Sequence, residues 1–474
     1  MVKPLTLQVR LLTVMERCFG ERYTSTVSDG GNVFKKKVII AALAATALFG
    51  TAVTATAADN PGLVPKKVWN SKVDKIKVGL VAPMTGVFAV LGISQRNSLQ
   101  VVADQINAAG GVGGAKIELV VRDGGLDPVA SANHAKELAG DSSINLVVGP
   151  SISSYYQGAA TYYEAAKKLN CQPAVAALDF TDYKYGFRSQ DYYKDTLSAL
   201  MAVAQKKSIK KIGMIYESGP TGTDFDAYIT AQASKYGITY LGWEKITSTL
   251  TSHNAELQKL MDKGAEAVVI SNNAYGAYTA KAAKELKFKG TLMGGSGAQN
   301  IAFHETGGDD FAGTLMAAPN YQWPLRTTWQ PGYKAHTDAI VKAYGSATGV
   351  KSGATSPNGT AIAADCLYAY AVAANKVRSL DTTKVRDAMA TLDIPAKMTP
   401  SGVRIHPGPE HNLYQSDGIN VYEWRKDAKG WYTMEVNAVA LATGVCPEVG
   451  WLAKTSTNQP LVCKKVGSKL RYKG

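Results

Sequence analysis

The chain has 474 residues, 46% hydrophobic and 19% charged, which is the composition of an ordinary soluble globular protein. Its length exceeds what a single hydrophobic core usually supports, so a one-domain protein is excluded as the starting assumption and two domains are expected. The formal charge of +14 comes from lysines scattered over predicted helix surfaces, a distribution that does not indicate a nucleic-acid partner.

The amino-terminal region predicts export. Residues 33–57 begin with a basic cluster, continue with an apolar run and end in the small-residue pattern Ala-Thr-Ala that a signal peptidase accepts. A membrane anchor is the alternative, because the apolar run approaches spanning length; its Thr-rich end and the lack of flanking charge favour cleavage. We therefore expect a periplasmic protein whose mature chain starts at Ala58. Residues 1–32 resemble neither a targeting sequence nor a packed domain, and we interpret them as an extension from a start codon assigned too far upstream.

From residue 76 onward, strand, loop and helix alternate in two runs. The first run contains four short apolar strands, at 77–82, 116–123, 144–149 and 173–177, and helices follow the first three. After a helix at 191–206, the second run has strands at 210–216, 238–246, 265–271 and 290–295. This alternation predicts parallel sheets built from right-handed βαβ units, and two runs predict an α/β protein of two lobes.

The last third of the chain departs from this alternation. Three helices, at about 332–344, 358–376 and 381–392, precede strand-like segments at 403–407, 419–426 and 430–436. We find no repeat of solenoid period that would change the two-lobe interpretation.

Four cysteines follow the predicted cleavage point, and an oxidising compartment permits disulfides between them. Cys446 and Cys463 flank a loop-like tail and are expected to be bridged, which would contribute about 3 kcal/mol in the chain-entropy model. Cys171 and Cys366 lie in apolar surroundings, where buried free thiols are the expected state.

No catalytic, cofactor or metal motif stands out. The glycines of 110–115 follow a helix and precede a strand, the reverse of a dinucleotide fingerprint, so this segment is interpreted as a turn. The chain lacks a P-loop, a G-x-S-x-G elbow and an H-E-x-x-H motif. His406, Glu410 and His411 stand close together in HPGPEH without regular ligand spacing, and a surface turn is preferred over a metal site. An enzyme remains an alternative only through groups that folding brings together.

The order of the motifs resembles a known family. KVGLVAPMTGVFAVLG, then DQINAAGGVGGAKIELVVRDGGLDPVASANHAKEL, then LVVGPSISS are similar to the amino-terminal lobe of type I periplasmic binding proteins. More narrowly, they resemble the branched-chain amino acid (Leu/Ile/Val) group of ABC-transporter substrate-binding proteins. The similarity continues through FRSQDYYKDTLSALMAV, KKIGMIYESGPTG, AEAVVIS and GTLMGGSG, and covers roughly residues 74–437.

This resemblance implies two Rossmann-like lobes joined by three crossovers, near 188, 318 and 400, that close on a small ligand. Lobe 1 is expected at 72–188 plus 319–400, lobe 2 at 189–318 plus 401–440, and a carboxyl-terminal extension at 441–474. The implied function is capture of a small-molecule ligand by a monomer and its delivery to an ABC transporter permease, without catalysis or cofactor. The alternative is a periplasmic ligand-sensing protein of the same fold that feeds a signalling partner.

The segment NLVVGPSISSYYQGA, residues 145–159, is the first candidate for the ligand site. In open α/β sheets ligands bind at the carboxyl ends of strands, and the free N–H groups of the helix that follows Gly149 point toward an anion. Ser153 and Ser154 add hydroxyl donors, so we expect the loop to hold a ligand carboxylate. The alternative is that these serines only cap the helix.

The remaining site residues are implied by the resemblance. In ALDFTDY, Thr181 would complete the polar cage with Asp179 and Phe180 as neighbours, and Phe88 and Leu91 of the first loop would form a wall. Asn272 and Ser296 of the second lobe would close over the ligand. The full candidate set is Ser153, Ser154, Asp179, Phe180, Thr181, Asn272, Ser296, Phe88 and Leu91.

Two of these positions depart from the family pattern. Amino-acid binders of this group commonly carry an aromatic residue where Asn272 stands and a glutamate where Ser296 stands. The glutamate would pair with the ligand ammonium, and a buried ammonium without a counter-charge costs several kcal/mol. The departure favours a ligand without an amino group, such as an aromatic or aliphatic carboxylate or an amide, unless Asp179 supplies the charge.

Overall fold

The structure is a computed structural model, and all the residues it describes lie between Ala57 and Gly474. The described residues are 69–86, 89–173, 180–247, 249–272, 275–299, 307–319, 331–345, 357–428, 430–435, 452–454, 460–466 and 469–473. In this part of the chain no helix is both long enough and apolar enough to cross a membrane.

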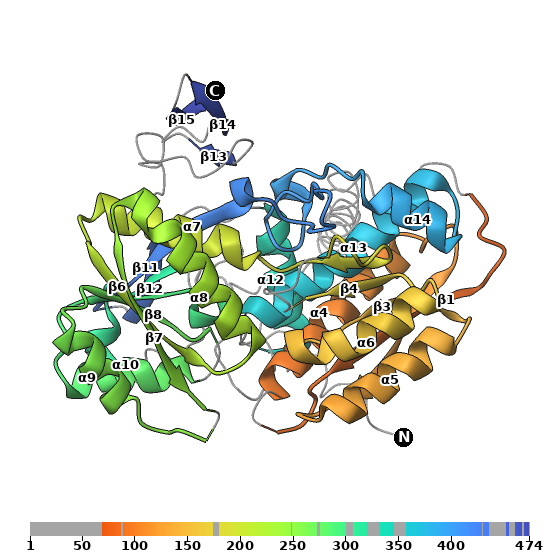
Figure 1. Cartoon of the computed structure of the whole chain (residues 1–474). Coiled ribbons are helices and arrows are strands. Elements are labelled where there is room, and N and C mark those ends of the chain that lie inside the picture. Colours follow the sequence, from red (N-terminus) through yellow and green to blue (C-terminus); the bar gives the residue numbers. More distant parts are fainter. Residues whose placement is uncertain are drawn as a thin grey trace, which may run out of the picture. The chain divides into compact units, whose positions relative to one another are not determined.

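The first sheet has five parallel strands in the order β2-β1-β3-β4-β5 (Figure 1). Its strands are β1 (Lys75–Ala82), β2 (Lys116–Asp123), β3 (Ile144–Val148), β4 (Asn170–Gln172) and β5 (Gly186–Arg188). The first three confirm the sequence prediction. The predicted fourth strand, at 173–177, lies outside the described residues except for residue 173, and β4 and β5 were not predicted. Both are three residues long, too short for a hydrophobic pattern to identify.

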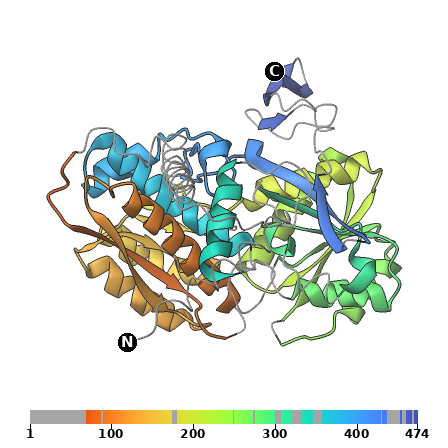
Figure 2. The same cartoon turned by 180° about the vertical axis from the view of Figure 1, so that it is seen from behind.

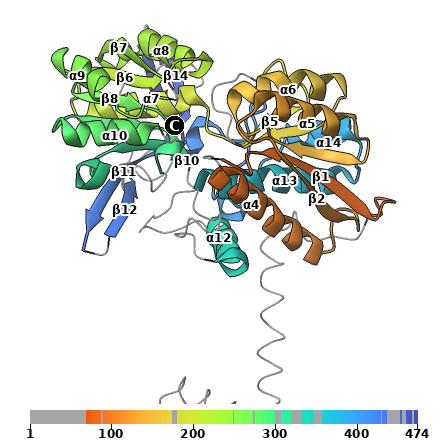
Figure 3. The ribbon, with the colours of Figure 1, turned by 90° about the horizontal axis from the view of Figure 1, so that it is seen from below.

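Helices cover both faces of the first sheet (Figure 3). On β1 the alternate residues Ile76, Val78 and Leu80 are buried with one group of helices, while Val81 is buried with the other. The first group comprises α4 (Ala89–Ala108), α13 (Pro357–Val377) and α14 (Thr382–Met389); the second comprises α5 (Pro128–Gly140) and α6 (Ser153–Ala165). Because successive strand residues point to opposite faces, a strand with apolar residues on both faces requires helices on both sides of the sheet.

The second sheet has seven strands in the order β12-β11-β10-β9-β8-β6-β7. They are β6 (Lys211–Glu217), β7 (Thr239–Ile246), β8 (Ala267–Ile270), β9 (Thr291–Gly294), β10 (Leu315–Pro319), β11 (Ile419–Asp427) and β12 (Gly430–Glu435). Strands β6 to β10 are parallel, and β11 and β12 add an antiparallel hairpin at one edge, seen as blue arrows in Figure 2. The sheet is therefore mixed where the sequence suggested a parallel one.

The helices of the second sheet follow the predicted alternation. They are α7 (Tyr193–Lys206), α8 (Pro220–Gln232), the 3-10 turn η1 (Ala233–Tyr236), α9 (Asn254–Asp262) and α10 (Gly276–Glu285). Ile212 and Met214 of β6 are buried with α7, α8 and η1, whereas Ile215 is buried with α9 and α10. Helix α12 (Pro331–Tyr344) precedes α13, and the predicted strand at 403–407 forms only an isolated bridge between Ile394 and Ile405.

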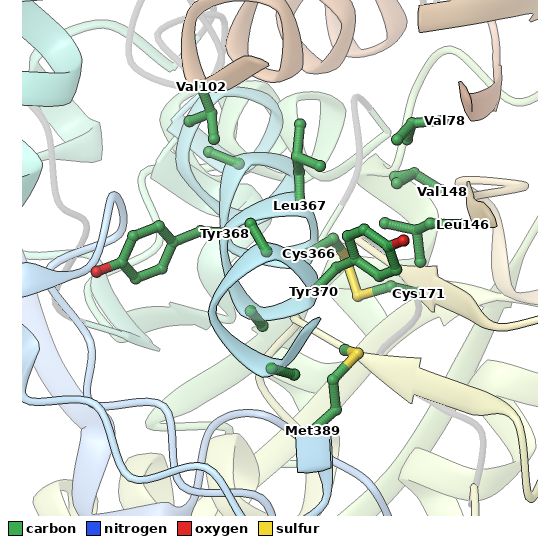
Figure 4. Close-up of a cluster of buried hydrophobic side chains, with 14 of the residues drawn as sticks. Val78, Val102, Leu146, Val148, Cys171, Cys366, Leu367, Tyr368, Tyr370 and Met389 are labelled. Carbon is green, nitrogen blue, oxygen red and sulfur yellow. A yellow bond between two sulfur atoms is a disulfide. The ribbon is translucent and has the colours of Figure 1, made fainter. Parts of the chain in front are cut away.

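A disulfide joins the two halves of the first core. Cys171 on β4 and Cys366 on α13 are bonded, and both are fully buried among Leu146, Val148 and Tyr370 (Figure 4). The expectation of free thiols was wrong. The two residues are 195 positions apart, and only the packing of α13 against the first sheet brings them together.

The carboxyl-terminal extension contains regular structure that the sequence did not predict. Strands β13 (Leu452–Lys454), β14 (Pro460–Val466) and β15 (Lys469–Lys473) form an antiparallel three-stranded sheet, so the expected loop-like tail was a wrong interpretation. Cys446 and the side chain of Cys463 fall outside what the structure describes, and their bridge stays a prediction. The crossover positions near 188, 318 and 400 also stay predictions.

Candidate functional site

The site begins where β3 ends, at Gly149. Its φ of +94° lies in the region that favours glycine, and a Cβ at this position would lie 2.1 Å from the carbonyl oxygen of Val81 on β1. The next bond, Gly149–Pro150, is cis. The backbone therefore passes directly against the neighbouring strand before it turns into α6, and no larger residue fits there.

Helix α6 starts without a side-chain cap. Its N-cap is Ile152, with φ −135° and ψ 129°, and no side chain accepts from the first turn. Ser153 and Ser154 are the first two helical residues, half-buried and exposed respectively, so they do not cap the helix. Within the described part of the chain neither hydroxyl has a hydrogen-bond partner. The helix N-terminus thus presents backbone N–H groups and two hydroxyls to an external acceptor.

Two buried amides support this loop from behind. Ser151 donates to Gln95 Oε1 on α4, and Gln172 Nε2 donates to the carbonyl oxygen of Gly149 at 3.0 Å and to Asn170 Oδ1 at 3.0 Å. Gln95, Ser151 and Gln172 are buried, and sequence reasoning missed all three. A polar side chain at each position was the only available signal, and it does not distinguish support of a loop from contact with a ligand.

From the second sheet, Asn272 binds the loop that follows β9. Its Oδ1 accepts the N–H of Gly295 at 2.5 Å, and a Cβ at Gly297 would lie 1.6 Å from its carbonyl oxygen. The ends of β8 and β9 are therefore locked together. The side-chain oxygen of Asn272, a predicted ligand residue, is therefore already used in a hydrogen bond within the protein.

Ser296 is bound to an acid that the sequence did not point to. Its hydroxyl donates to Asp191 Oδ1 at 2.8 Å and accepts from Gln190 Nε2 at 2.7 Å. Gln190 Nε2 also contacts Asp191 Oδ1, and Thr196 Oγ1 donates to Asp191 Oδ2 at 2.8 Å. Burial raises the pKa of Asp191, although the hydroxyls of Thr196 and Ser296 lower it in part.

This contact changes the charge argument made from the sequence. An acid is missing at position 296 itself, but a carboxyl group lies one hydrogen bond away, in the segment between β5 and α7. The segment FRSQDYY contains it, and its sequence gives no reason to place Asp191 beside the end of β9. Only the fold brings positions 191 and 296 together.

Residues that follow strands of both sheets act electrostatically on the first turn of α6. The pKa of Tyr155, in the first turn of α6, is raised mainly by burial and next by the charges of Asp127 and Tyr275. Asp127 caps α5 in the first lobe, whereas Tyr275 precedes α10, on the loop that contains Asn272. The loop after β8 is therefore within electrostatic reach of the uncapped end of α6.

The other predicted site residues are placed as follows. Phe180 is fully buried and stacks on Tyr156 with ring centroids 5.1 Å apart, so its ring serves the first core. Leu91 is half-buried on α4, and Thr181 is exposed. Phe88 and Asp179 lie outside the described residues.

A second buried carboxyl group lies away from these loops, on α13. Asp365 accepts hydrogen bonds from the Ser401 backbone N–H at 3.1 Å, from the Ser401 hydroxyl and from Tyr414 Oη at 2.8 Å. Burial raises its pKa to about 7, although these donors lower it in part. The group ties α13 to the chain that leads into β11.

The histidines of HPGPEH are structural in this arrangement. His406 Nε2 lies 2.8 Å from Asp417 Oδ1, and the ring of His411 stacks on Phe187 with centroids 4.6 Å apart. Among the described residues, no group of three or more His, Cys, Asp or Glu side chains is arranged to hold a metal ion.

The chain is similar to known proteins both in sequence and in fold. A family model described as periplasmic binding protein matches residues 75–429. The leucine-, isoleucine-, valine-, threonine- and alanine-binding protein of Pseudomonas aeruginosa is 26% identical over 366 residues, which cover 75% of this chain and 91% of that protein.

Two solved structures share the fold. A periplasmic binding protein type 1 from Bordetella pertussis superposes with a TM-score of 0.68 at 18% identity, covering 77% of this chain and 100% of that one. A solute-binding protein from Rhodopseudomonas palustris, in complex with 4-hydroxybenzoate, gives 0.66 at 19% identity, covering 77% and 96%. By its matched residues and its two α/β sheets, the chain belongs to the periplasmic binding protein family.

Proposed function

We propose that the protein is the solute-binding component of an ABC importer. It captures a small ligand with a carboxylate, amide or amino-acid-like head group between two lobes that close on it, and delivers the ligand to permease subunits in the inner membrane. It acts as a monomer that is exported to the periplasm by a cleaved signal peptide, and it releases its ligand chemically unchanged.

The observation that carries the proposal is the uncapped start of α6. The backbone N–H groups and the hydroxyls of Ser153 and Ser154 are donors for which the described residues supply no acceptor, whereas the N–H of Tyr155 already donates to the carbonyl oxygen of Ile152. Donors of this kind suit a carboxylate or an amide oxygen, because the helix N-terminus carries partial positive charge. Tyr275, on the loop after β8, contributes to the electrostatic environment of Tyr155 in the same helix turn, which is compatible with a ligand held between the two loops.

The possible ligand classes share a carboxylate and differ in whether the ligand also carries an amino group. The acid at Asp191 supports an amino-acid ligand more than the sequence alone did, since a carboxyl group stands behind Ser296. The names of the relatives point both ways, because one binds aliphatic amino acids and one structure holds 4-hydroxybenzoate. Both classes share the carboxylate, which is the part of the ligand that the first-lobe donors would bind.

Native mass spectrometry of the purified protein, followed by calorimetric titration of amino acids, benzoates and amides, tests this function. A retained or titrated small molecule that is recovered with unchanged mass supports it. Conversion of the molecule would support an enzyme instead, and saturable binding without any effect on uptake in cells would favour a sensor.

The donors at α6 can be tested with a matched pair of variants. Replacing Ser153 and Ser154 together by Ala removes two hydroxyl hydrogen bonds to a charged acceptor, and each such bond contributes about 1.5–3 kcal/mol. We expect at least a tenfold loss of affinity. Ser142→Ala, an exposed serine just before β3, at the opposite end of that strand, is the control and should leave affinity unchanged. Equal affinity of the double variant and the control would contradict the assignment of the site.

A further inference from the structure

The carbonyl oxygen of Gly149, where β3 leads into the loop before α6, accepts hydrogen bonds from two side chains. Tyr163 Oη donates to it at 3.0 Å, and Gln172 Nε2 donates to it at 3.0 Å. The N–H of Gly149 donates to the carbonyl oxygen of Cys171 on β4, also at 3.0 Å. Both backbone polar groups of Gly149 are therefore bound within the protein.

The two side-chain donors come from different elements of the first lobe. Tyr163 is in the last turn of α6, the helix whose N-terminus is the candidate ligand site, and Gln172 is the last residue of β4. Both side chains are fully buried, so the carbonyl group of Gly149 points into the protein interior. We call the two donors and this carbonyl group the Gly149 clamp.

The direction of this carbonyl group matters for an anion bound after it. A carbonyl oxygen carries partial negative charge, and one that turned toward the start of α6 would repel a ligand carboxylate there. A buried carbonyl group keeps the direction in which it finds hydrogen-bond donors. The Gly149 clamp therefore keeps an acceptor away from the candidate anion site and fixes the start of the loop that leads to Ser153.

We propose that Tyr163 and Gln172 are positioning residues for the ligand site. They act through Gly149, without contact with the ligand, and they raise its affinity by holding the loop in its binding geometry. This inference rests on the proposed function, because it assumes that the loop binds a ligand. The alternative is that the two donors only satisfy a buried carbonyl group, in which case they stabilise the fold and leave affinity unchanged.

Two tyrosines on the same helix supply a matched pair of variants. Tyr156 is about two helical turns before Tyr163, is also fully buried, and donates from its hydroxyl to Asn170 Oδ1 at 3.0 Å. Tyr163→Phe and Tyr156→Phe therefore remove the same atom and one hydrogen bond of the same length. Only the hydrogen bond of Tyr163 ends at Gly149.

Calorimetric titration separates positioning from stability. The probes are leucine and 4-hydroxybenzoate, one from each ligand class named for the relatives. A variant that is only less stable contains fewer folded molecules, so its stoichiometry falls while its affinity is unchanged. A displaced loop lowers affinity at unchanged stoichiometry. We expect Tyr163→Phe to weaken binding at least about threefold, as the loss of one net hydrogen bond does, and Tyr156→Phe to weaken it less than about twofold.

Gln172→Met extends the test to the second donor, with a side chain of similar size. Each single variant leaves one side-chain donor to Gly149, whereas Tyr163→Phe combined with Gln172→Met leaves none among the described residues. A buried acceptor without a donor costs more than the loss of one hydrogen bond out of two. We therefore expect the double variant to weaken binding by more than the product of the two single losses.

Amide hydrogen exchange tests the Gly149 clamp without a ligand. Under conditions in which both variants are folded, the peptide that spans residues 150–156 should exchange faster in Tyr163→Phe than in Tyr156→Phe, because the loop opens more often.

Two outcomes would overturn the positioning role. One is equal affinity of Tyr163→Phe and Tyr156→Phe for a probe that the unaltered chain binds, and the other is equal exchange of residues 150–156 in the two variants. Binding of neither probe by the unaltered chain would instead contradict the proposed function for these ligand classes. The exchange comparison would then still decide whether the Gly149 clamp holds the loop.

Discussion

The disulfide between Cys171 and Cys366 makes the sharpest prediction about stability. It closes a loop of 195 residues that contains all the parallel strands of the second sheet, β6 to β10. In the chain-entropy model, a cross-link of that length stabilises the folded state by about 5 kcal/mol, because the unfolded chain loses conformational freedom. For roughly 400 folded residues, whose unfolding entropy is about 2.1 cal/mol/K each, this corresponds to a melting temperature about 6 °C lower without the bond.

The assay compares Cys171→Ala, Cys366→Ala and the double variant with the unaltered chain in thermal and urea unfolding. A bond is lost once, whichever sulfur is removed, so each single variant and the double variant should lose nearly the same free energy of unfolding. Two independent buried thiols would instead give two small costs that add. Additive costs, or a melting temperature that falls by less than about 1 °C, would refute the cross-link.

Three further predictions follow from buried groups and close contacts. Burial raises the pKa of Asp365 to about 7, so its contribution to stability is complete below its unfolded pKa and is lost as pH rises through about 7. Asp365→Asn should therefore flatten the dependence of the urea midpoint on pH between about 4 and 8. Parallel curves for the variant and the unaltered chain would contradict this. Gly149→Ala should lower the free energy of unfolding in urea by at least about 3 kcal/mol, because its Cβ would overlap a carbonyl oxygen. Gly114 has a φ of +84° but open space around it, so Gly114→Ala should lower the free energy of unfolding by only about 1 kcal/mol. Similar losses for the two variants would show that the loop at Gly149 can relax. Ser296→Ala should lower the free energy of unfolding by about 1–3 kcal/mol, and by more at high pH, where Asp191 is ionised. If Ser296→Ala lowers it equally in an Asp191→Asn background, the hydrogen bond between Ser296 and Asp191 is not the cause of the loss.

The alternation of strands and helices could be predicted from the sequence, because apolar strands and helices of regular spacing follow one another along the chain. Strands β1, β2, β3, β6, β7, β8 and β9 were predicted near their true positions for this reason. Strands β4 and β5 were missed because each has only three residues, and the sheet of the carboxyl-terminal extension was missed because its strands mix polar and apolar residues without a clear period. Strand β10 was missed although its five residues are apolar and buried, since so short an apolar run does not by itself identify a strand.

The candidate site divides in the same way. Gly149 and the serines after it could be singled out because a strand end, a glycine and the start of a helix are local features of one segment. The role of Ser296 could not, since it depends on Asp191, which is 105 residues away in sequence and 2.8 Å away in the fold. From the sequence, Ser296 implied that the site has no carboxyl group at this position, and the structure places the carboxyl group of Asp191 beside it.

The sequence by itself therefore determined the two α/β lobes and the family resemblance, and it singled out the loop after Gly149 as a candidate ligand site; all three rest on patterns within a few tens of residues. Only the tertiary structure decided the pairing of Cys171 with Cys366 and the partner of Ser296. The physical reason is common to both cases. Each depends on contacts between segments far apart in the chain, and the free energy of such contacts comes from burial and hydrogen bonds that exist only once helix α13 and the segment between β5 and α7 are packed in place.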